Sequence, residues 1–302
     1  MHFEGAQISV RTVVKNAYND IMNNHTMSMA AGLSYYFVLG LFPLLILLAS
    51  IVGYLPIPDL FNHILSAMAQ VVPADSMGLV RRVVKTVIKP HSGLLTVGII
   101  GTLWSATGGF AGLIEALNVA YDVPETRPIW KTRLLSLALT FVTGLLLVIG
   151  LGVLIVGPKL GMWIADLVNM GSTFMTVWPY IKWTISVAFT ILAIEVILFW
   201  APNVRQRFSA TLPGAVIGVV FWIGSSYGLG LYFQKFAHYN QTYGVLGAAM
   251  MLMVWLYWSW FAILAGAEIN SELVKAGGGN KLELKEKPPA AVEPRPAWKE
   301  AA

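Results

Sequence analysis

The sequence has no cysteine and few charged residues, and both shortages narrow what the protein can be. Without cysteine among its 302 residues, the chain cannot form disulfides, thiolate nucleophiles or cysteine metal sites. Charged residues make up 12% of the chain and hydrophobic residues 57%, whereas charged residues alone are about a quarter of a soluble domain. A chain with so little charge is expected to have lipid as its main solvent.

The sequence also lacks residue patterns of common enzyme classes. Its five histidines are scattered singly, without an HxxxH pair or a carboxylate at metal-ligand spacing. It has no GxxxxGK[ST] phosphate loop and no GxGxxG fingerprint. We therefore expect no catalytic residue, no cofactor and no metal site, and we predict that the protein is not an enzyme. An intramembrane enzyme assembled from dispersed residues is the alternative within this class.

Six long apolar stretches dominate the sequence. Each holds about the 20 residues that an α-helix needs to cross ~30 Å of hydrocarbon. The stretches do not alternate between polar and apolar residues, which favours helices over barrel strands. The predicted fold class is all-α, a polytopic membrane protein with a bundle of six transmembrane helices. The stretches are Met29–Tyr54, Leu94–Leu117, Leu134–Val156, Trp178–Trp200, Gly214–Phe236 and Val245–Ile269.

The positions of the basic residues predict the orientation and the partners. If both termini are cytoplasmic, thirteen of the 20 lysines and arginines lie inside and seven outside, as the positive-inside rule requires. The basic residues lie in loops and in the tail, beside anionic headgroups, and are not interleaved with base-stacking aromatics. We therefore expect membrane lipids as partners and no nucleic acid. The sequence does not indicate an oligomeric state.

The first external loop, residues 55–93, is predicted to contain two short amphipathic helices. In the second, apolar residues line one side while Arg81, Lys85 and Lys89 stand four apart on the other. This pattern is typical of a helix lying in a membrane interface. The three basic residues are candidate headgroup contacts on the external leaflet. The alternative is a solvated face of a helix that packs on the bundle.

The apolar stretches divide the chain into three parts. Residues 1–28 are predicted to form a cytoplasmic segment without a cleavable signal sequence, so the first span acts as the insertion signal. Residues 29–276 form the six-helix transmembrane domain. Residues 277–302 begin with three glycines and are rich in Pro, Glu and Lys, which predicts a disordered cytoplasmic tail.

Glu195 is the clearest polar candidate inside a span. A charged side chain in hydrocarbon costs about 2.5 to 3.5 kcal/mol even on a lenient scale, so such groups usually face the bundle or a wet cavity. Glu195 lies in ILAIEVILFW, just before Pro202. One hypothesis is a protonatable or cation-binding carboxylate, and the other is a hydrogen-bonded structural glutamate.

Further polar candidates lie near the ends of the spans. Glu115 closes the second span, and the loop after it supplies Arg127, Lys131 and Arg133. An ion-pair cluster of these residues would orient the second and third helices, or would bind an anionic headgroup. Glu268, Asn270 and Glu272 end the sixth span, where we expect them to be solvated boundary residues.

Small residues mark two helix faces. In the first span Gly32, Tyr36, Gly40 and Pro43 share one face, which is expected to look inward. Tyr36 is the candidate functional residue of this face. In the fifth span Gly214 with Gly218, and Gly224 with Gly228, repeat a spacing that lets helices approach closely. Such faces are more often packing seams than transport paths.

Several ordered segments resemble the YihY/BrkB membrane proteins. They are AAGLSYYFVLGLFPLL from Ala30, LWSATGGFAGLIEALNVAYDVPETRPIWKTR from Leu103, PN at Pro202, LPGA at Leu212, YGVLGAAMMLMVWLY from Tyr243, and GAEIN from Gly266. The resemblance covers about Ala17 to Leu273 and implies a bacterial inner-membrane protein with six spans. It implies no settled activity. Some family members are named ribonuclease BN, but this sequence has no group that would activate water on a phosphodiester.

These observations lead to a ranked set of functions. The leading hypothesis is a permease-like protein that handles a lipid or an amphiphilic anion. The alternative is a non-transporting scaffold that binds envelope partners through the external helices or the tail. An intramembrane enzyme ranks third.

Overall fold

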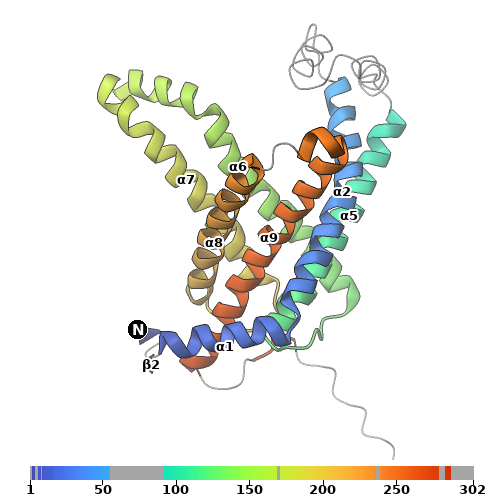
Figure 1. Cartoon of the computed structure of the whole chain (residues 1–302), viewed down its shortest axis with the longest axis vertical. Helices are drawn as coiled ribbons and strands as arrows, with labels where there is room; N and C mark the ends of the chain where they lie inside the picture. The colour runs from blue at the N-terminus through green and yellow to red at the C-terminus, as the bar shows by residue number, and fades with distance from the viewer. Residues whose placement is uncertain are drawn as a thin grey trace, which may run out of the picture. The chain divides into compact units, whose positions relative to one another are not determined.

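A computed structural model describes residues 2–3, 6–7, 9–54, 92–168, 171–235, 239–278 and 283–286. The described chain is almost entirely helical (Figure 1). Near the N-terminus, strands β1 (His2–Phe3) and β2 (Ala6–Gln7) pair in antiparallel fashion. The helices are α1 (Val10–Asn23), α2 (Thr26–Tyr54), α5 (Ser92–Ala120), α6 (Ile129–Val168), α7 (Gly171–Trp200), α8 (Phe208–Lys235) and α9 (Tyr239–Gly278).

Six of these helices are long and apolar enough to cross a membrane, and the predicted fold class is confirmed. The six segments have 23 to 28 residues each, which exceeds the ~20 residues that a span requires. Of the predicted external loop, residues 55–91, including Arg81, Lys85 and Lys89, lie outside the described residues. The spans are Thr26–Leu48, Gly93–Ala120, Ile129–Leu154, Thr176–Trp200, Phe208–Phe233 and Ala249–Ala276.

The described chain divides into two compact units. The smaller unit is Ser34–Gly109, and the larger unit combines Met1–Leu33 with Phe110–Ala302. Helices α2 and α5 contribute residues to both units. The boundaries of the transmembrane domain drawn from the sequence stay a prediction.

In the smaller unit, α2 and α5 approach closely through small residues. A Cβ added to Gly98 would lie 2.9 Å from the Leu47 Cα, and one added to Gly101 would lie 2.9 Å from the Pro43 Cβ. Part of the α2 face that was expected to look inward is therefore a helix–helix seam. Tyr36 of the same face is half exposed.

In the larger unit, glycines let α8 and α9 pack backbone to backbone. A Cβ on Gly214 would lie 2.6 Å from the Gly266 carbonyl oxygen, and one on Gly218 would lie 3.2 Å from the Ala262 carbonyl oxygen. The seam predicted for Gly214 and Gly218 is confirmed. Gly224, by contrast, has no atom of the described residues within 4 Å of an added Cβ.

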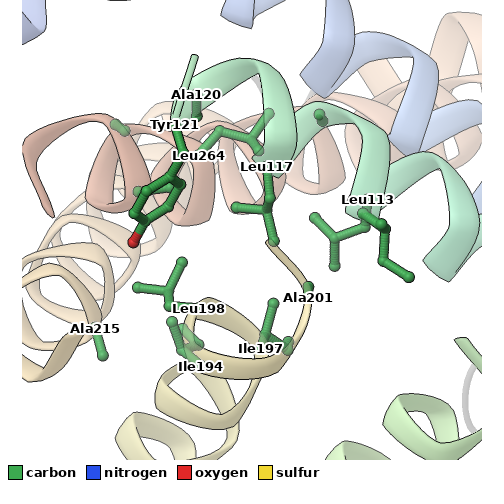
Figure 2. Close-up of a cluster of buried hydrophobic side chains, with 14 of the residues drawn as sticks. Leu113, Leu117, Ala120, Tyr121, Ile194, Ile197, Leu198, Ala201, Ala215 and Leu264 are labelled. Atoms are coloured by element: carbon green, nitrogen blue, oxygen red, sulfur yellow. The ribbon is translucent and has the colours of Figure 1, made fainter. Parts of the chain in front are cut away.

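The core of the larger unit lies where α5 ends against α7, α8 and α9. Buried side chains from these helices form one cluster. Figure 2 shows the Tyr121 ring reaching from the end of α5 into this cluster, with Leu198 and Ile194 of α7 nearby. Tyr121 is fully buried, so the core extends to the end of the spans.

Helix α1 was not predicted from the sequence. It packs against the end of α9 (Figure 1) and buries Val13 and Ala17. Apolar residues at positions 10, 13, 14, 17, 18 and 21 have helical spacing, which is the signal that could have revealed it.

We predict that Gly214→Ala lowers the thermal unfolding temperature of the protein in detergent. The added methyl group would collide with the backbone of α9, and overpacking of this kind costs about 1 to 3 kcal/mol. Gly224→Ala in the same helix is the matched control and should leave the unfolding temperature unchanged or higher, because its Cβ enters open space. Equal losses in both variants would contradict the seam.

Candidate functional site

Buried polar side chains gather at one end of the larger unit, where α5, α7 and α9 end. Polar groups without partners are costly in a low-dielectric interior, so they cluster and bond to one another. The buried members from these helices, from the start of α8 and from the adjoining loops are Asn118, Glu195, Asn203, Thr211, Glu268, Asn270, Ser271 and Glu272.

Glu195 lies inside the fourth span and is only 1% exposed. The Thr211 Oγ1 lies 2.5 Å from the Glu195 Oε1 and 2.7 Å from the Phe208 carbonyl oxygen. The Glu195 Oε2 is buried and has no hydrogen-bond partner among the described residues. No lysine, arginine or histidine in the described part of the chain forms an ion pair with Glu195.

The contacts of Thr211 indicate where a proton can sit. A threonine hydroxyl has one hydrogen and can donate only one of these two short contacts. Both contacts are hydrogen bonds when the Glu195 carboxyl carries a proton and donates to Thr211, while Thr211 donates to the Phe208 carbonyl. The geometry therefore suits a protonated, neutral Glu195 carboxyl.

A second chain of hydrogen bonds links α5, α9 and α8. Helix α5 ends in a Schellman motif, in which the Val123 amide donates to the Asn118 carbonyl and Asp122 has a left-handed φ of 53°. This turn places the Tyr121 hydroxyl 3.0 Å from the Asn270 Nδ2, which donates to it. The Asn270 Oδ1 in turn accepts from the Gly214 amide at 3.2 Å. Burial raises the pKa of Tyr121, so its hydroxyl stays neutral.

Glu268 joins the beginning of α2 to α9. Its Oε1 accepts hydrogen bonds from the Thr26 hydroxyl at 2.8 Å and from the side-chain Nδ2 of Asn24 at 3.2 Å. Glu268 and Asn270 are fully buried. Glu272 is buried as well, at 8% exposed. The expectation that Glu268, Asn270 and Glu272 are solvated boundary residues is therefore wrong, because α1, α2 and α5 cover this end of α9.

Lys275 is partly exposed at the same end and pairs with acidic side chains, of which Glu272 is buried. Its Nζ lies 2.6 Å from the Asp122 Oδ2, 2.9 Å from the Glu272 Oε1 and 3.9 Å from the Asp20 Oδ2. Asn16 of α1 also donates to Glu272. Burial, and the negative charge of Glu272, raise the pKa of Asp20. This cluster ties α1 and the α5–α6 loop to α9.

Arg127 holds the α5–α6 loop against the end of α7. Its Nε and Nη2 donate to the two carboxylate oxygens of Glu125 at 2.8 and 2.7 Å, and Nη2 also donates to the Ala201 carbonyl. The Arg127 side chain is only 7% exposed. Burial alone would raise the pKa of Glu125, but the hydrogen bonds from Arg127 and Asn118 outweigh it and lower the pKa below the ordinary value of 4.5.

Asn203 connects three separate segments. Its backbone N–H donates to the Asn118 Oδ1 at 2.7 Å. Its side-chain Nδ2 donates to the Thr126 hydroxyl, and its side-chain Oδ1 accepts from the Glu286 backbone N–H. Lys285 donates to the carbonyls at the end of α7, and burial together with the charge of Arg127 lowers its pKa to about 8.

Residues 283–286 therefore pack against the larger unit. They belong to the segment predicted to be a disordered tail, and the structure differs from that expectation at these four positions. The physical reason is that the loops around residues 203 and 126 offer backbone and side-chain partners that composition does not reveal.

The structure brings only some of the predicted site residues together. Glu195 and Arg127 belong to the buried end, but Glu115 and Arg133 are exposed and form no ion pair within the described ranges. The predicted cluster is wrong in its acidic partners, because Arg127 pairs with Glu125 and Lys131 pairs with Glu286. Tyr36 lies in the other unit. Sequence reasoning did not single out Tyr121 or Asn203, and it placed Glu268 among solvated boundary residues, since the partners of all three lie far away in the chain.

One motif in α8 has the letters of a nucleophile elbow without its geometry. Gly224 to Gly228 reads GSSYG, which matches GxSxG, but an elbow requires a sharp turn from a strand into a helix. Here the segment continues a helix, and Ser226 accepts a hydrogen bond from the Trp255 indole of α9 at 3.0 Å. Among the described residues, no three His, Asp or Glu side chains gather as metal ligands.

We predict that Glu125→Gln removes a pH-dependent part of the stability. Because the folded-state pKa of Glu125 is lowered, its stabilising effect is complete above the ordinary value of 4.5 and is lost as the pH falls through the folded-state pKa. Thermal unfolding at pH 3 to 7 should show the wild type above the variant near neutral pH. The difference should shrink below about pH 4. A difference that is constant with pH would contradict the lowered pKa.

We also predict that Asn203→Ala frees the segment 283–286. Loss of its side-chain hydrogen bonds leaves buried groups unpaired and should cost about 1 to 3 kcal/mol of unfolding free energy. Cleavage after Lys285 by a lysine-specific protease, followed by mass spectrometry, should become faster. Asn19→Ala, which changes an exposed asparagine of α1, is the control. Unchanged cleavage in Asn203→Ala would show that Asn203 does not hold the segment.

Comparison with known proteins finds relatives over most of the chain. The family model described as Virulence factor BrkB matches residues 17–291. The Bacillus subtilis (strain 168) protein named "Putative ribonuclease-like protein YfkH" is 34% identical over 263 residues, which are 87% of this chain and 95% of the relative. No solved structure matches the chain.

Two other relatives are named only as membrane proteins. The UPF0761 membrane protein of Tolumonas auensis is 26% identical over 257 residues, with 81% of this chain and 80% of the relative covered. The UPF0761 membrane protein YihY of Escherichia coli O1:K1 / APEC is 24% identical over 208 residues, with 65% and 64% covered. The family match and the six spans agree with the resemblance seen in the sequence. The chain therefore belongs to the BrkB family of multi-pass membrane proteins.

Proposed function

We propose that this protein is permease-like and moves a lipid or another amphiphilic anion across the membrane, with Glu195 as its proton-carrying group. The observation that carries the proposal is the Glu195 carboxyl, which is buried inside a span with one oxygen unpartnered among the described residues. An unsatisfied buried acceptor costs about 1 to 3 kcal/mol, and polar groups inside spans commonly mark substrate or proton pathways.

A comparison with Glu268 supports a functional use of Glu195. Glu268 is equally buried but accepts hydrogen bonds from two neutral donors, Thr26 and Asn24, that join separate helices. Those bonds account for Glu268 as a structural group. Among the described residues, Thr211 is the only side chain that forms a hydrogen bond with Glu195. Because the Thr211 hydroxyl has one hydrogen for two short contacts, both contacts are hydrogen bonds when the Glu195 carboxyl is neutral.

The start of α6 supports an anionic amphiphile as the substrate class. Ile129 and Trp130 are 81% and 64% exposed, and Arg133 is exposed three residues further on, whereas Lys131 pairs with Glu286. Exposed aromatic and cationic side chains at the end of a span suit the headgroup level of a membrane. Phosphate-bearing headgroups match this charge.

We further propose a non-enzymatic role in the bacterial inner membrane with both termini cytoplasmic. Arg127, Lys131 and Lys285 lie at the end of the larger unit that also holds α1. An excess of basic residues at this end supports a cytoplasmic location by the positive-inside rule. The ribonuclease-like name belongs to the Bacillus relative, and our proposal includes no ribonuclease activity.

The test is lipid and anion movement in liposomes that contain the purified protein. Movement of fluorescent phospholipids with anionic or zwitterionic headgroups would be measured by quenching the fluorescence of the outer leaflet. Movement of amphiphilic anions would be measured as efflux from the liposomes, and both assays would be run at several pH values. Glu195→Gln keeps the side-chain shape but removes the titratable proton. We expect a rate at least severalfold lower, or a rate that no longer depends on pH.

Glu115→Gln is the matched control. Both glutamates lie five residues before the last residue of their helices, but Glu115 is exposed, so its change should leave the rate and its pH dependence intact. Absence of movement for all probes, with the protein correctly folded, would refute the permease. A stoichiometric partner recovered by crosslinking, together with cellular function that survives Glu195→Gln, would select the scaffold instead.

A further inference from the structure

Helix α1 (Val10–Asn23) presents three different faces. One face packs against α9 and buries Val13 and Ala17. A second face consists of exposed apolar residues at every fourth position, and a third consists of exposed polar residues. The second face is Val10, Val14, Tyr18 and Met22, and the third is Thr12, Asn19 and Asn23.

A short connection in the sequence and one hydrogen bond place α1 at the level where the spans begin and end. Its last residue, Asn23, is separated from the start of the first span at Thr26 by only two residues. Near its middle, Asn16 donates to the Glu272 Oε2 at 2.9 Å, and Glu272 lies four residues before the end of the sixth span at Ala276. Helix α1 also packs against the end of α9 (Figure 1). This level corresponds to the boundary between hydrocarbon and headgroups.

The outward charge of α1 is positive. At 100° per residue, Lys15 falls at the border between the apolar face and the polar face, and Arg11 falls inside the apolar face near this border, between Tyr18 and Met22. Both are exposed, and neither pairs with a carboxylate in the described part of the chain. The acidic residue of α1, Asp20, instead faces Lys275 of α9. Long basic side chains at such a border can cover apolar surface with their stems and extend their charges toward headgroups.

We infer that α1 is a membrane-interface helix that binds anionic phospholipid. Its Val10–Met22 face lies among acyl chains, Arg11 and Lys15 contact lipid phosphates, and Thr12, Asn19 and Asn23 face water. This arrangement gives each of the three faces the solvent that its residues require. The inference concerns lipid binding alone and holds whether or not the protein moves a substrate.

The absence of cysteine from the sequence allows single-cysteine spin labels on the full chain in nanodiscs. Val14→Cys and Tyr18→Cys report on the apolar face, and Asn19→Cys is the matched control on the polar face. We expect labels at 14 and 18 to be relaxed more by oxygen than by a water-soluble nickel complex, and the label at 19 to show the reverse. A Val14 label as open to nickel as the Asn19 label would place the helix in water and overturn the proposal. A Val14 label shielded from both reagents would show that protein, such as a second copy, covers the face.

The charge part of the proposal is tested separately. In the Val14→Cys background, nanodiscs containing phosphatidylglycerol should move the label deeper than nanodiscs of phosphatidylcholine alone. Arg11→Gln together with Lys15→Gln should abolish this shift. An unchanged unfolding temperature, and unchanged accessibility of the label in the Asn19→Cys variant, would show that the helix is intact. If phosphatidylglycerol has no effect in the parent, or the same effect in the double variant, these two residues do not bind anionic lipid.

Discussion

A polar group that is buried in a membrane protein must find its partner within the protein, because hydrocarbon offers none. Most buried polar side chains of the larger unit follow this constraint, but the Glu195 Oε2, the Gln206 Oε1 and the Ser271 Oγ have no partner in the described part of the chain. The buried polar side chains of this unit lie at the end of the spans, where α1, the α5–α6 loop and residues 283–286 supply donors and acceptors. Asn203 and Glu268 satisfy their polar atoms by joining segments that lie far apart in the sequence. The bonds that remove unpaired polar groups thus also position the helices.

Glu195 differs from Gln206 and Ser271 because its side chain is ionisable. Its Oε1 has Thr211 for a partner, whereas its Oε2 has none in the described part of the chain. Helix packing follows a different rule, since lipid is as apolar as the helices and does not drive them together. Contact then depends on close fit, which Gly214 and Gly266 provide in one unit and Gly98 in the other. Glycines set the distance between the helices, and polar bonds set their register at one end.

Much of the fold could be predicted from the sequence because the signals are local. Twenty apolar residues in a row indicate a span wherever the rest of the chain lies, and all six spans were predicted. The close packing of Gly214 and Gly218 was also predictable from their spacing. Helix α1 could have been predicted, since Val10, Val13 and Ala17 have helical spacing, but it is too short and too polar to resemble a span.

The amino-acid order by itself determined the six spans, the family and the presence of a glutamate inside the fourth span, because each depends on composition or on residues within a few turns of one another. Only the tertiary structure decided which polar groups are buried. Glu115 and Glu195 lie equally far from the ends of their helices, yet one is exposed and the other buried. Glu125, rather than Glu115, became the partner of Arg127 for the same reason. Burial and partner choice depend on which neighbouring helix covers a given face, and that neighbour comes from a distant part of the chain.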